Sequence, residues 1–354
     1  MRIALVSTPF VRVPPPAYGG TELVVHVLAR ALGRLGHQVT LFATGDSRAP
    51  RLRSFFDRPV WPPDPYAELL HCRAAAREIA AGTFDVIHAH VPAMLAFADE
   101  LELPFVYTLH HEEVPSLARY YAAVPAPVWR VAISARQAAL ASPPPQAVVH
   151  HGLDPAMYPS CGDGGEAAFF LGRLSWVKGP ELAIDAARRA ALQIVVAGEK
   201  HPDDAPPGWS EEVLEPALRA RGVTVVGRAD LAAKRRLFAR SRALLAPMRW
   251  EEPFGLVMIE ALLAGCPVIA YARGAAPEIV EEGENGFLVR DVAEMAEALG
   301  RAAGLDRAAI QARARERFSA DRMAAEYVGI YRAAGARGLD PAAAGGDGWT
   351  TLAT

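Results

Sequence analysis

Residues 250–270, "WEEPFGLVMIEALLAGCPVIA", place two carboxylates, Glu252 and Glu260, beside an almost wholly apolar run. Removing a carboxylate from water is costly unless a partner binds it. The pattern predicts a short helix over 255–265 and a buried strand over 266–271, so free N–H groups at the helix start can face an anion. Both glutamates can face one elongated ligand, because carboxylates accept hydrogen bonds from vicinal hydroxyls. The alternative is a surface Glu252 and an ordinary helix-face charge at Glu260.

Apolar strands and amphipathic helices alternate on both sides of this stretch. The expected strands are 2–7, 37–43, 84–90, 103–111, 129–134, 146–152, 167–174, 192–198, 223–227, 243–247 and 286–290. The other expected helices are 21–36, 65–82, 180–191, 210–220, 231–241, 292–303, 306–318 and 319–338. This alternation is typical of an α/β protein with open parallel sheets covered by helices. Ligands of such sheets bind beyond the carboxyl ends of the strands.

The length and one break in the pattern predict two domains. A chain of 354 residues is too long for a typical single core. Residues 155–167, "PAMYPSCGDGGEA", are rich in Pro and Gly, as a linker would be. We therefore expect domains over 1–158 and 159–318 with a cleft between them. Residues 338–354 lack periodicity and are expected to be disordered.

Composition excludes several classes of protein. The formal net charge is −3, so there is no overall basic field for nucleic acid. No apolar run reaches the roughly 18 residues of a membrane span, and the N-terminus does not resemble a signal peptide. The three cysteines are far apart and suggest neither a disulfide framework nor a zinc site. These features indicate a cytoplasmic protein, with peripheral contact at the inner membrane face left open.

Two further loops suit a phosphate-bearing ligand. "YGGTE", residues 18–22, presents Gly19 and Gly20 at a helix start. "LGRLSWVKGP", residues 171–180, carries Arg173 and Lys178 across a strand-to-helix turn, where two cations can clamp a diphosphate. The alternatives are a glycine turn that only begins a helix and two solvated surface cations.

Histidines gather at the expected strand ends of the first half, at positions 88, 90, 110, 111, 150 and 151. For His88, His111 and His150 we favour core or loop positions without a binding role. A metal site is the weakest interpretation, because HxH and HH pairs here lack a supporting carboxylate pattern.

"EPFGLVMIEALLAG" followed by "PVIA" resembles the E-x7-E signature of retaining GT-B glycosyltransferases, in particular glycosyltransferase family 4. Other matching segments occur in order: "PPAYGGTELVVHVLARALGRLGHQVTLFA", "FDVIHAH", "VYTLHH", "AIS", "GLD", "GRLSWVKG" and "VTVVG". The resemblance extends from residue 1 to about 335. It implies the GT-B fold, two Rossmann-like doubly wound domains facing across a cleft, with a last helix at about 319–336 crossing back to the first domain.

The resemblance also implies a role for each matching residue. The residues expected to act in catalysis are His110, Arg173, Lys178 and Glu252. Those expected to bind the donor are Gly19, Gly20, Val226, Gly227, Phe254, Gly255, Leu256, Val257 and Glu260. Glu252 is expected to bind sugar hydroxyls, Glu260 the ribose, and Arg173 with Lys178 the diphosphate. The base is expected near Val226, and His90 and His151 are expected near the acceptor or the cleft.

Two departures from the family pattern bear on the acceptor side. His151 in "HHGLD" stands where the family commonly has Asn, and "ISARQ" lacks the acidic residue often found after the Ser. The connection from 112 to 130 is short and rich in Pro and aromatic residues, and we expect it to shape the acceptor site.

The implied activity is transfer of a hexose from a nucleoside-diphosphate sugar, with UDP or GDP, to a hydroxyl of a glycan, lipid-linked or small-molecule acceptor in carbohydrate biosynthesis. No metal or other cofactor is expected, because Arg173 and Lys178 supply the positive charge. Two alternatives remain: a GT-B-type nucleotide-sugar epimerase or hydrolase, and a non-catalytic subunit that binds nucleotide sugars.

Overall fold

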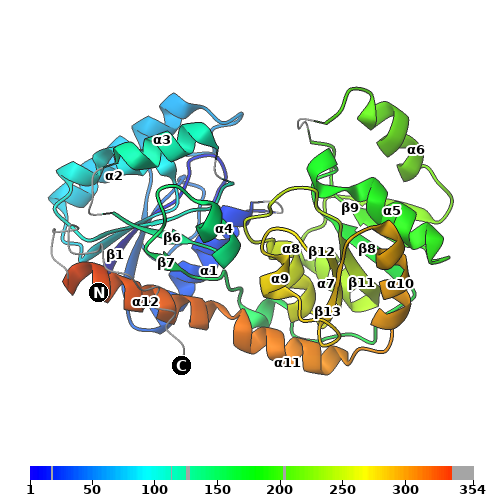
Figure 1. The fold of residues 1–354 in the computed structure, drawn as a ribbon. Coiled ribbons are helices and arrows are strands. Elements are labelled where there is room, and N and C mark those ends of the chain that lie inside the picture. The colour runs from blue at the N-terminus through cyan, green and yellow to red at the C-terminus, as the bar shows by residue number, and fades with distance from the viewer. Residues whose placement is uncertain (17–18, 113, 125–127, 202–204, 337–354) are drawn as a thin grey trace. The chain divides into compact units, whose positions relative to one another are not determined.

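The computed structural model describes residues 1–16, 19–112, 114–124, 128–201 and 205–336. Two compact units divide the chain, Met1–Gly152 together with the segment from Ala320, and Leu153–Ser319. Each unit is a parallel sheet with helices packed on it (Figure 1). This confirms the predicted fold class, two Rossmann-like α/β domains. The expected disordered tail over 338–354 lies outside the described residues.

The first unit is built on a seven-stranded sheet in the order β3-β2-β1-β4-β5-β6-β7. Its strands pair only in parallel: β1 Arg2–Val6, β2 Gln38–Phe42, β3 Leu52–Arg53, β4 Val86–Ala89, β5 Phe105–Thr108, β6 Val128–Ala132 and β7 Ala147–Val148. Every residue of β4 and β5 is buried, as expected of central strands covered on both faces. The sequence analysis missed only β3, whose two residues are too short to show a pattern.

Helices cover both faces of this sheet. They are α1 Gly20–Arg34, α2 Pro65–Ala81, α3 Pro115–Ala123, α4 Ala135–Leu140 and α12 Ala320–Ala336, with a 3-10 helix η1 at Pro92–Glu100. The predicted return of the last helix is confirmed, because α12 packs against α1 and β5 (Figure 1). The sequence analysis did not anticipate η1, α3 and α4, which are short and follow no clear apolar period.

The second unit is a six-stranded parallel sheet in the order β10-β9-β8-β11-β12-β13. Its strands are β8 Ala167–Leu171, β9 Ile194–Ala197, β10 Val223–Gly227, β11 Ser241–Ala246, β12 Val268–Tyr271 and β13 Gly286–Val289. Its α-helices are α5 Pro180–Arg189, α6 Glu215–Leu218, α7 Leu231–Arg240, α8 Leu256–Leu263, α9 Ala276–Ile279, α10 Val292–Ala302 and α11 Arg307–Arg317. The unit also contains the 3-10 helices η2 Pro155–Met157 and η3 Trp176–Lys178 and the π-helix η4 Trp209–Leu214.

The boundary between the units lies at Gly152, ahead of the expected position near residue 158. The N–H of Leu153 donates to the carbonyl of Phe318 at 2.9 Å, and Leu153 is fully buried. Tyr158 is also buried in the second unit, where its hydroxyl contacts Glu260. The Pro-rich composition that suggested a linker therefore belongs to a packed segment.

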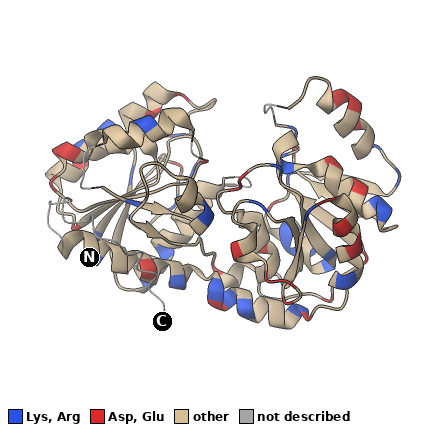
Figure 2. Cartoon of the chain, viewed as in Figure 1, with Lys and Arg blue, Asp and Glu red and all other residues tan. Residues whose placement is uncertain are grey.

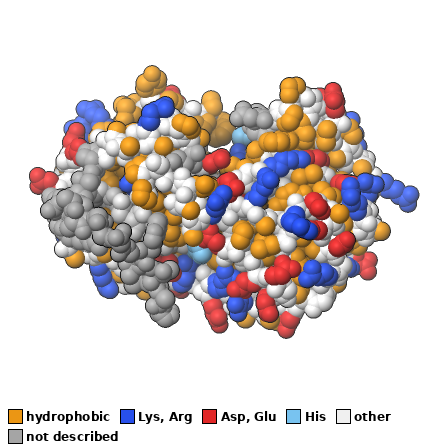
Figure 3. Space-filling view, in the orientation of Figure 1, with side chains coloured by type: hydrophobic (Ala, Val, Ile, Leu, Met, Phe, Trp, Pro, Cys, Tyr) orange, Lys and Arg blue, Asp and Glu red, His pale blue; other side chains and the backbone are white. Residues whose placement is uncertain are grey.

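Surface charges are mixed in sign. Figure 2 shows Lys and Arg interspersed with Asp and Glu on the side drawn, in keeping with the net charge of −3. Hydrophobic side chains lie between charged ones on the second unit in Figure 3. Within the described residues, none of the helices is long and apolar enough to cross a membrane.

Tyr327 of α12 is fully buried, and its hydroxyl lies 2.7 Å from Thr108 Oγ1 on β5. Replacing it with Ala should cost about 3 to 5 kcal/mol, as for other large buried aromatic side chains. Hydrogen exchange of the β4 and β5 amides measures this loss. Tyr66→Ala on α2, where Tyr66 is 77% exposed, is the control and should change stability by less than about 0.5 kcal/mol. Equal protection in the two variants would show that α12 is not part of the first unit's core.

Candidate functional site

Arg173 lies in the loop between β8 and α5. Its Nε is buried and has no hydrogen-bond partner in the described parts of the chain. A buried donor without an acceptor is costly, and a guanidinium group matches the oxygens of a phosphate. The loop approaches β9 closely, because a Cβ on Gly198 would lie 1.8 Å from the carbonyl oxygen of Gly172. Arg173 is thus held on a tight loop with a donor that lacks an acceptor.

Lys178, Trp250 and Glu252 form a compact cluster. Lys178 Nζ pairs with Glu252 Oε2, and the two side chains are 17% and 12% exposed. Trp250 Nε1 donates to the same oxygen at 2.8 Å, and Lys178 Nζ lies 4.8 Å from the centre of the indole ring. The structure thus brings together two residues that are 74 positions apart and that the sequence analysis had named separately.

Arg249 connects the loop after β11, which carries Trp250 and Glu252, to the segment that carries Lys178. Its Nη1 donates to the Trp176 carbonyl at 2.6 Å, its backbone N–H donates to Val177 at 2.8 Å, and its Nη2 pairs with Glu181. The sequence analysis missed Arg249. No local pattern marks it, because its partners lie on a distant segment.

Helix α8 begins at Leu256, after Gly255 with φ of 90°. A side chain at this φ would be strained, so glycine is favoured at position 255. The expected helix start is confirmed, with Glu252 before the helix and Glu260 inside it. The first N–H groups of a helix have no partner within it, so those of Leu256 and Val257 can face a ligand.

The loop after β12 fixes the backbone of Glu252. The N–H of Ala275 donates to the carbonyl of Glu252 at 3.0 Å. A Cβ on Gly274 would lie 2.4 Å from both the nitrogen and the carbonyl oxygen of Glu252. This close approach of two loops positions the Glu252 carboxylate, and the sequence analysis did not find it.

Glu260 is 4% exposed and has its own partners inside the second unit. Oε1 accepts from the Tyr158 hydroxyl at 2.8 Å, and Lys234 Nζ of α7 lies 2.9 and 3.2 Å from the two oxygens. Burial, followed by the Glu260 charge, raises the pKa of Tyr158, so its hydroxyl stays protonated and donates. A carboxylate has about four acceptor positions, so these three contacts leave room for a ligand hydroxyl.

Val226 and Gly227 lie at the end of the edge strand β10. Val226 is 42% exposed, and the carbonyl of Gly227 accepts from Gly198 at 2.8 Å. This strand end therefore lies beside the Arg173 loop and presents an apolar side chain. Phe254 is buried and packs against Phe318.

In the first unit, Gly19 and Gly20 begin α1. The helix starts at Gly20, one residue before the expected start at residue 21, and Gly19, with φ of 150°, precedes it. Glu22 in the first turn accepts from the Thr8 hydroxyl at 2.7 Å, and burial raises the pKa of Glu22. The glycines thus lie at a helix N-terminus whose first turn already contains a buried carboxyl group.

Four histidines form a row in the first unit, in which His88, His90 and His151 are buried and His110 is half-buried. His90 Nδ1 lies 2.7 Å from His110 Nε2, the His110 and His151 rings stack at 5.3 Å, and the His88 and His90 rings lie 4.2 Å apart. His88 contacts the hydroxyls of Tyr331 and Thr108 at 2.7 and 2.8 Å. The structure thus brings His90, His110 and His151 together.

Burial, followed by the charge of neighbouring histidines, lowers the pKa values of His88, His90 and His110 well below the usual value. Burial, followed by Arg322, lowers the pKa of His151 to about 3. The row is therefore neutral at neutral pH, and each ring offers one donor and one acceptor nitrogen.

For His88, His111 and His150 the sequence analysis favoured core or loop positions without a binding role. His88 is a core residue, whereas His111 is exposed and His150 is half-buried. In the described residues, no three His, Cys, Asp or Glu side chains are placed to hold a metal ion. Asp203 and Asp204 of "HPDDAP" lie outside those residues.

Two family models match the two units in turn. Residues 18–149 match Glycosyltransferase Family 4, and residues 165–304 match Glycosyl transferases group 1. Glycogen synthase from Mycobacterium tuberculosis is 28% identical over 89% of both chains. The phosphatidyl-myo-inositol mannosyltransferase of that organism is 28% identical over 82% of both. Spore coat protein SA from Bacillus subtilis is 31% identical, but the match spans only 36% of either chain.

Solved structures share the architecture. A glycosyltransferase involved in avilamycin A biosynthesis is 25% identical, with a TM-score of 0.74, over 95% of this chain and 98% of the other. Sucrose-phosphate synthase from Thermosynechococcus elongatus is 20% identical, with a TM-score of 0.75, over 95% and 99%. The second likeness shows the fold alone.

The neutral histidines predict that the first unit loses stability in mild acid. Their folded pKa values lie below the unfolded value of about 6.5, so the unfolded chain binds more protons below that pH. Above about pH 6.5 these histidines should not change the free energy of unfolding. As the pH is lowered below this value, the free energy of unfolding should fall by up to about 1.4 kcal/mol per pH unit for each of His88, His90 and His151. Urea unfolding at several pH values measures this slope.

The slope should become smaller in His90→Gln. It should remain unchanged in His201→Gln, whose exposed side chain lies in the second unit. Identical slopes in the wild type and in His90→Gln would show that the row is not the source of the acid sensitivity.

Proposed function

Because this chain is a GT-B glycosyltransferase of the family 4-like type, we propose that it is a retaining enzyme that uses a nucleoside-diphosphate sugar. It transfers the sugar, a hexose, to a hydroxyl group of an acceptor. The second unit binds the donor. The observation that carries this proposal is the buried Arg173 Nε that lacks an acceptor. It lies on the same loop as Lys178, which pairs with Glu252 just ahead of α8.

The leaving group determines what the site must do. Departure of the nucleoside diphosphate builds negative charge on its terminal phosphate, and preorganised donors stabilise such charge strongly. Arg173, Lys178 and the N–H groups of Leu256 and Val257 are the donors that we assign to it. Since these groups supply the positive charge, we propose that turnover requires no metal ion.

Glu252 is assigned to the sugar and Glu260 to the ribose. Lys178 pairs with Glu252, so one lysine can neutralise Glu252 and contact the diphosphate next to it. Glu260 lies deeper, with Lys234 and Tyr158 holding its carboxylate in one orientation. An oriented carboxylate favours ligands with hydroxyl groups, because a ligand without them leaves the remaining acceptor position of the carboxylate without a donor.

His110 is assigned to a sugar hydroxyl. Its Nε2 is engaged by His90 at 2.7 Å, so Nδ1 is the nitrogen left for a ligand. Being neutral, the ring can exchange a hydrogen bond with a hydroxyl without adding charge. His90 and His151 hold the ring in place, and Val226 with Gly227 is assigned to the base.

Incubation with UDP-, GDP- and ADP-sugars and a panel of acceptors tests the proposal. NMR of the product should show the anomeric configuration of the donor. Consumption of the donor without any acceptor would instead indicate a hydrolase or epimerase. Donor binding without turnover would indicate a non-catalytic subunit.

Lys178→Ala should lower kcat by about 100-fold or more, the scale for removing one stabiliser of a developing oxyanion. Arg173→Ala should behave similarly, and the double variant should lose less than the sum because both residues act on one group. Initial rates at saturating donor, with and without EDTA, measure these effects.

Lys200→Ala is the matched control, because Lys200 lies in the same unit and pairs with Glu215 at the surface. The control and the wild type should remain active in EDTA. Activity abolished by EDTA and restored by magnesium or manganese would contradict the mechanism.

Glu260→Gln should lower affinity for the bare nucleoside diphosphate about tenfold, because ribose hydroxyls lose a charged acceptor. Calorimetry with the nucleoside diphosphate and with its 2′-deoxy form shows whether the loss of affinity comes from the ribose hydroxyl. The wild type should prefer the ribose form, and Glu260→Gln should lose this preference.

Glu252→Gln should leave affinity for the bare nucleoside diphosphate nearly unchanged and should lower the transfer rate. If Glu252→Gln abolished the ribose preference and Glu260→Gln kept it, the two carboxylates would have been assigned to the wrong ends of the donor.

A further inference from the structure

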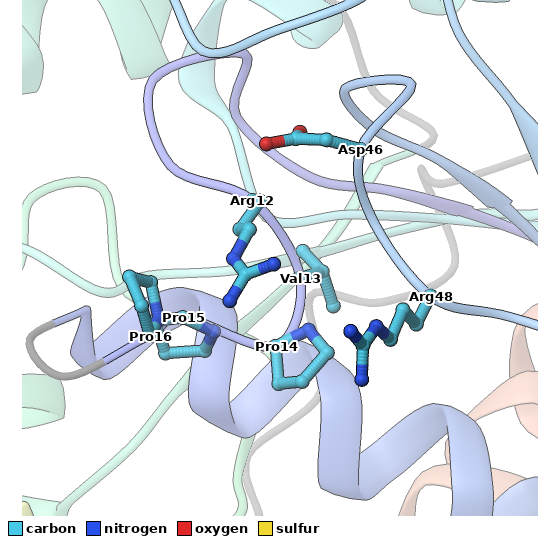
Figure 4. Close-up of a pocket in the computed structure, with 7 residues that line it drawn as sticks. All are labelled: Arg12, Val13, Pro14, Pro15, Pro16, Asp46 and Arg48. Atoms are coloured by element: carbon cyan, nitrogen blue, oxygen red, sulfur yellow. The ribbon is translucent and has the colours of Figure 1, made fainter. Parts of the chain in front are cut away.

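A small pocket in the first unit has a lining that includes none of the histidines of the row and none of the residues assigned to catalysis. It is lined by Arg12, Val13, Pro14, Pro15, Pro16, Asp46 and Arg48 and has a volume of about 160 Å³ (Figure 4). This volume suits one phosphate or carboxylate group with its nearest atoms, but not a nucleotide sugar.

The pocket carries net positive charge, because two arginines and one aspartate line it. Neither Arg12 nor Arg48 has an ion-pair partner within the described ranges, and Arg12 is half-buried. The carboxylate of Asp46 accepts from the Thr44 hydroxyl at 2.7 Å. Figure 4 shows this carboxylate apart from both guanidinium groups. Two cations thus border a small space and lack a carboxylate that pairs with them.

The loops that carry the arginines are held in place by hydrogen bonds. Arg48 N–H donates to the Val13 carbonyl at 2.7 Å, and Val13 N–H donates to the Ser47 hydroxyl at 2.9 Å. Ser47 is buried, and its hydroxyl lies 3.1 Å from that of Thr44. The two guanidinium groups therefore extend from loops whose backbones are already fixed.

The position in the sheet also points to a ligand. The loops follow β1 and β2, which are neighbours in the first sheet, and so lie at the carboxyl ends of parallel strands. Open α/β sheets bind their ligands at this edge. The diphosphate, the ribose and the base of the donor have been assigned to the second unit, so this edge of the first sheet is available for the second substrate.

We propose that Arg12 and Arg48 bind a phosphate or carboxylate group of the acceptor. This inference rests on the proposed function, since it names the class of the acceptor. A guanidinium fork donates two parallel hydrogen bonds to such a group, and two forks bind one oxyanion from two sides. The acceptor is therefore an acidic molecule.

Calorimetry with glucose 6-phosphate, glucuronate and glucose tests this directly, because the probes share a ring and differ in charge. The wild type should bind at least one charged probe about tenfold or more tightly than glucose, the effect of one charge-assisted hydrogen bond. Arg12→Gln and Arg48→Gln should each remove most of this preference. Arg77→Gln, on the exposed surface of α2, is the matched control and should keep it.

A second experiment, with lipid vesicles, tests whether the charged group belongs to a lipid headgroup or to a soluble acceptor. Phosphatidylcholine vesicles with and without phosphatidylinositol are compared by co-sedimentation. Arg12- and Arg48-dependent binding to the phosphatidylinositol vesicles supports a lipid headgroup as the source, and dependence seen only with the sugar acids supports a soluble acceptor.

Equal affinity for the three sugars together with no preference for phosphatidylinositol would overturn the proposal. A charge preference that survives in the Arg12→Gln/Arg48→Gln double variant would also overturn it. Binding of the nucleoside diphosphate serves as the folding control, because these arginines are not in the donor site. If the wild type transferred no sugar to any acceptor, the proposed function would be wrong. The pocket would still be tested by calorimetry, through the preference for the charged sugars over glucose.

Discussion

The second unit depends on two carboxylates kept away from water next to an apolar helix. Glu252 and Glu260 are tolerated there because each has a lysine and an aromatic donor as partners, Lys178 with Trp250 and Lys234 with Tyr158. A buried charge without such partners would be strongly destabilising. These pairings draw the loops after β8 and β11 and helix α7 toward α8, and they place cations beside carboxylates where a ligand with phosphates and hydroxyls can bind.

Much of this could be predicted from the sequence. Strand and helix positions follow from the periodicity of apolar residues, and Gly255 marks the start of α8 because its φ of 90° excludes other residues. The partners of Glu260 and the role of Arg249 could not be predicted. Lys234 and Arg249 act on segments far away in the chain, and side-chain pairing over such distances leaves no periodic signal. The domain boundary was misplaced for a related reason, because a Pro-rich composition does not reveal that Tyr158 is buried.

The first unit differs from the second in the polar groups that it buries. Its interior contains a row of histidines whose low pKa values keep them neutral, so the region offers hydrogen bonds without charge. Positive charge is presented separately, by Arg12 and Arg48 in the loops at the carboxyl ends of β1 and β2. The two units thus differ in chemistry, with neutral rings and arginine cations in one and paired carboxylates in the other.

The central claim is that the second unit holds the diphosphate of the donor through Arg173. A crystal structure with a bound nucleoside diphosphate tests it most directly, through the distance from Arg173 Nε to the nearest phosphate oxygen. We predict a hydrogen bond of about 2.7 to 3.2 Å, which gives this buried donor its missing acceptor. A nucleotide bound with its phosphates beyond hydrogen-bond distance of both Arg173 and Lys178 would contradict the account.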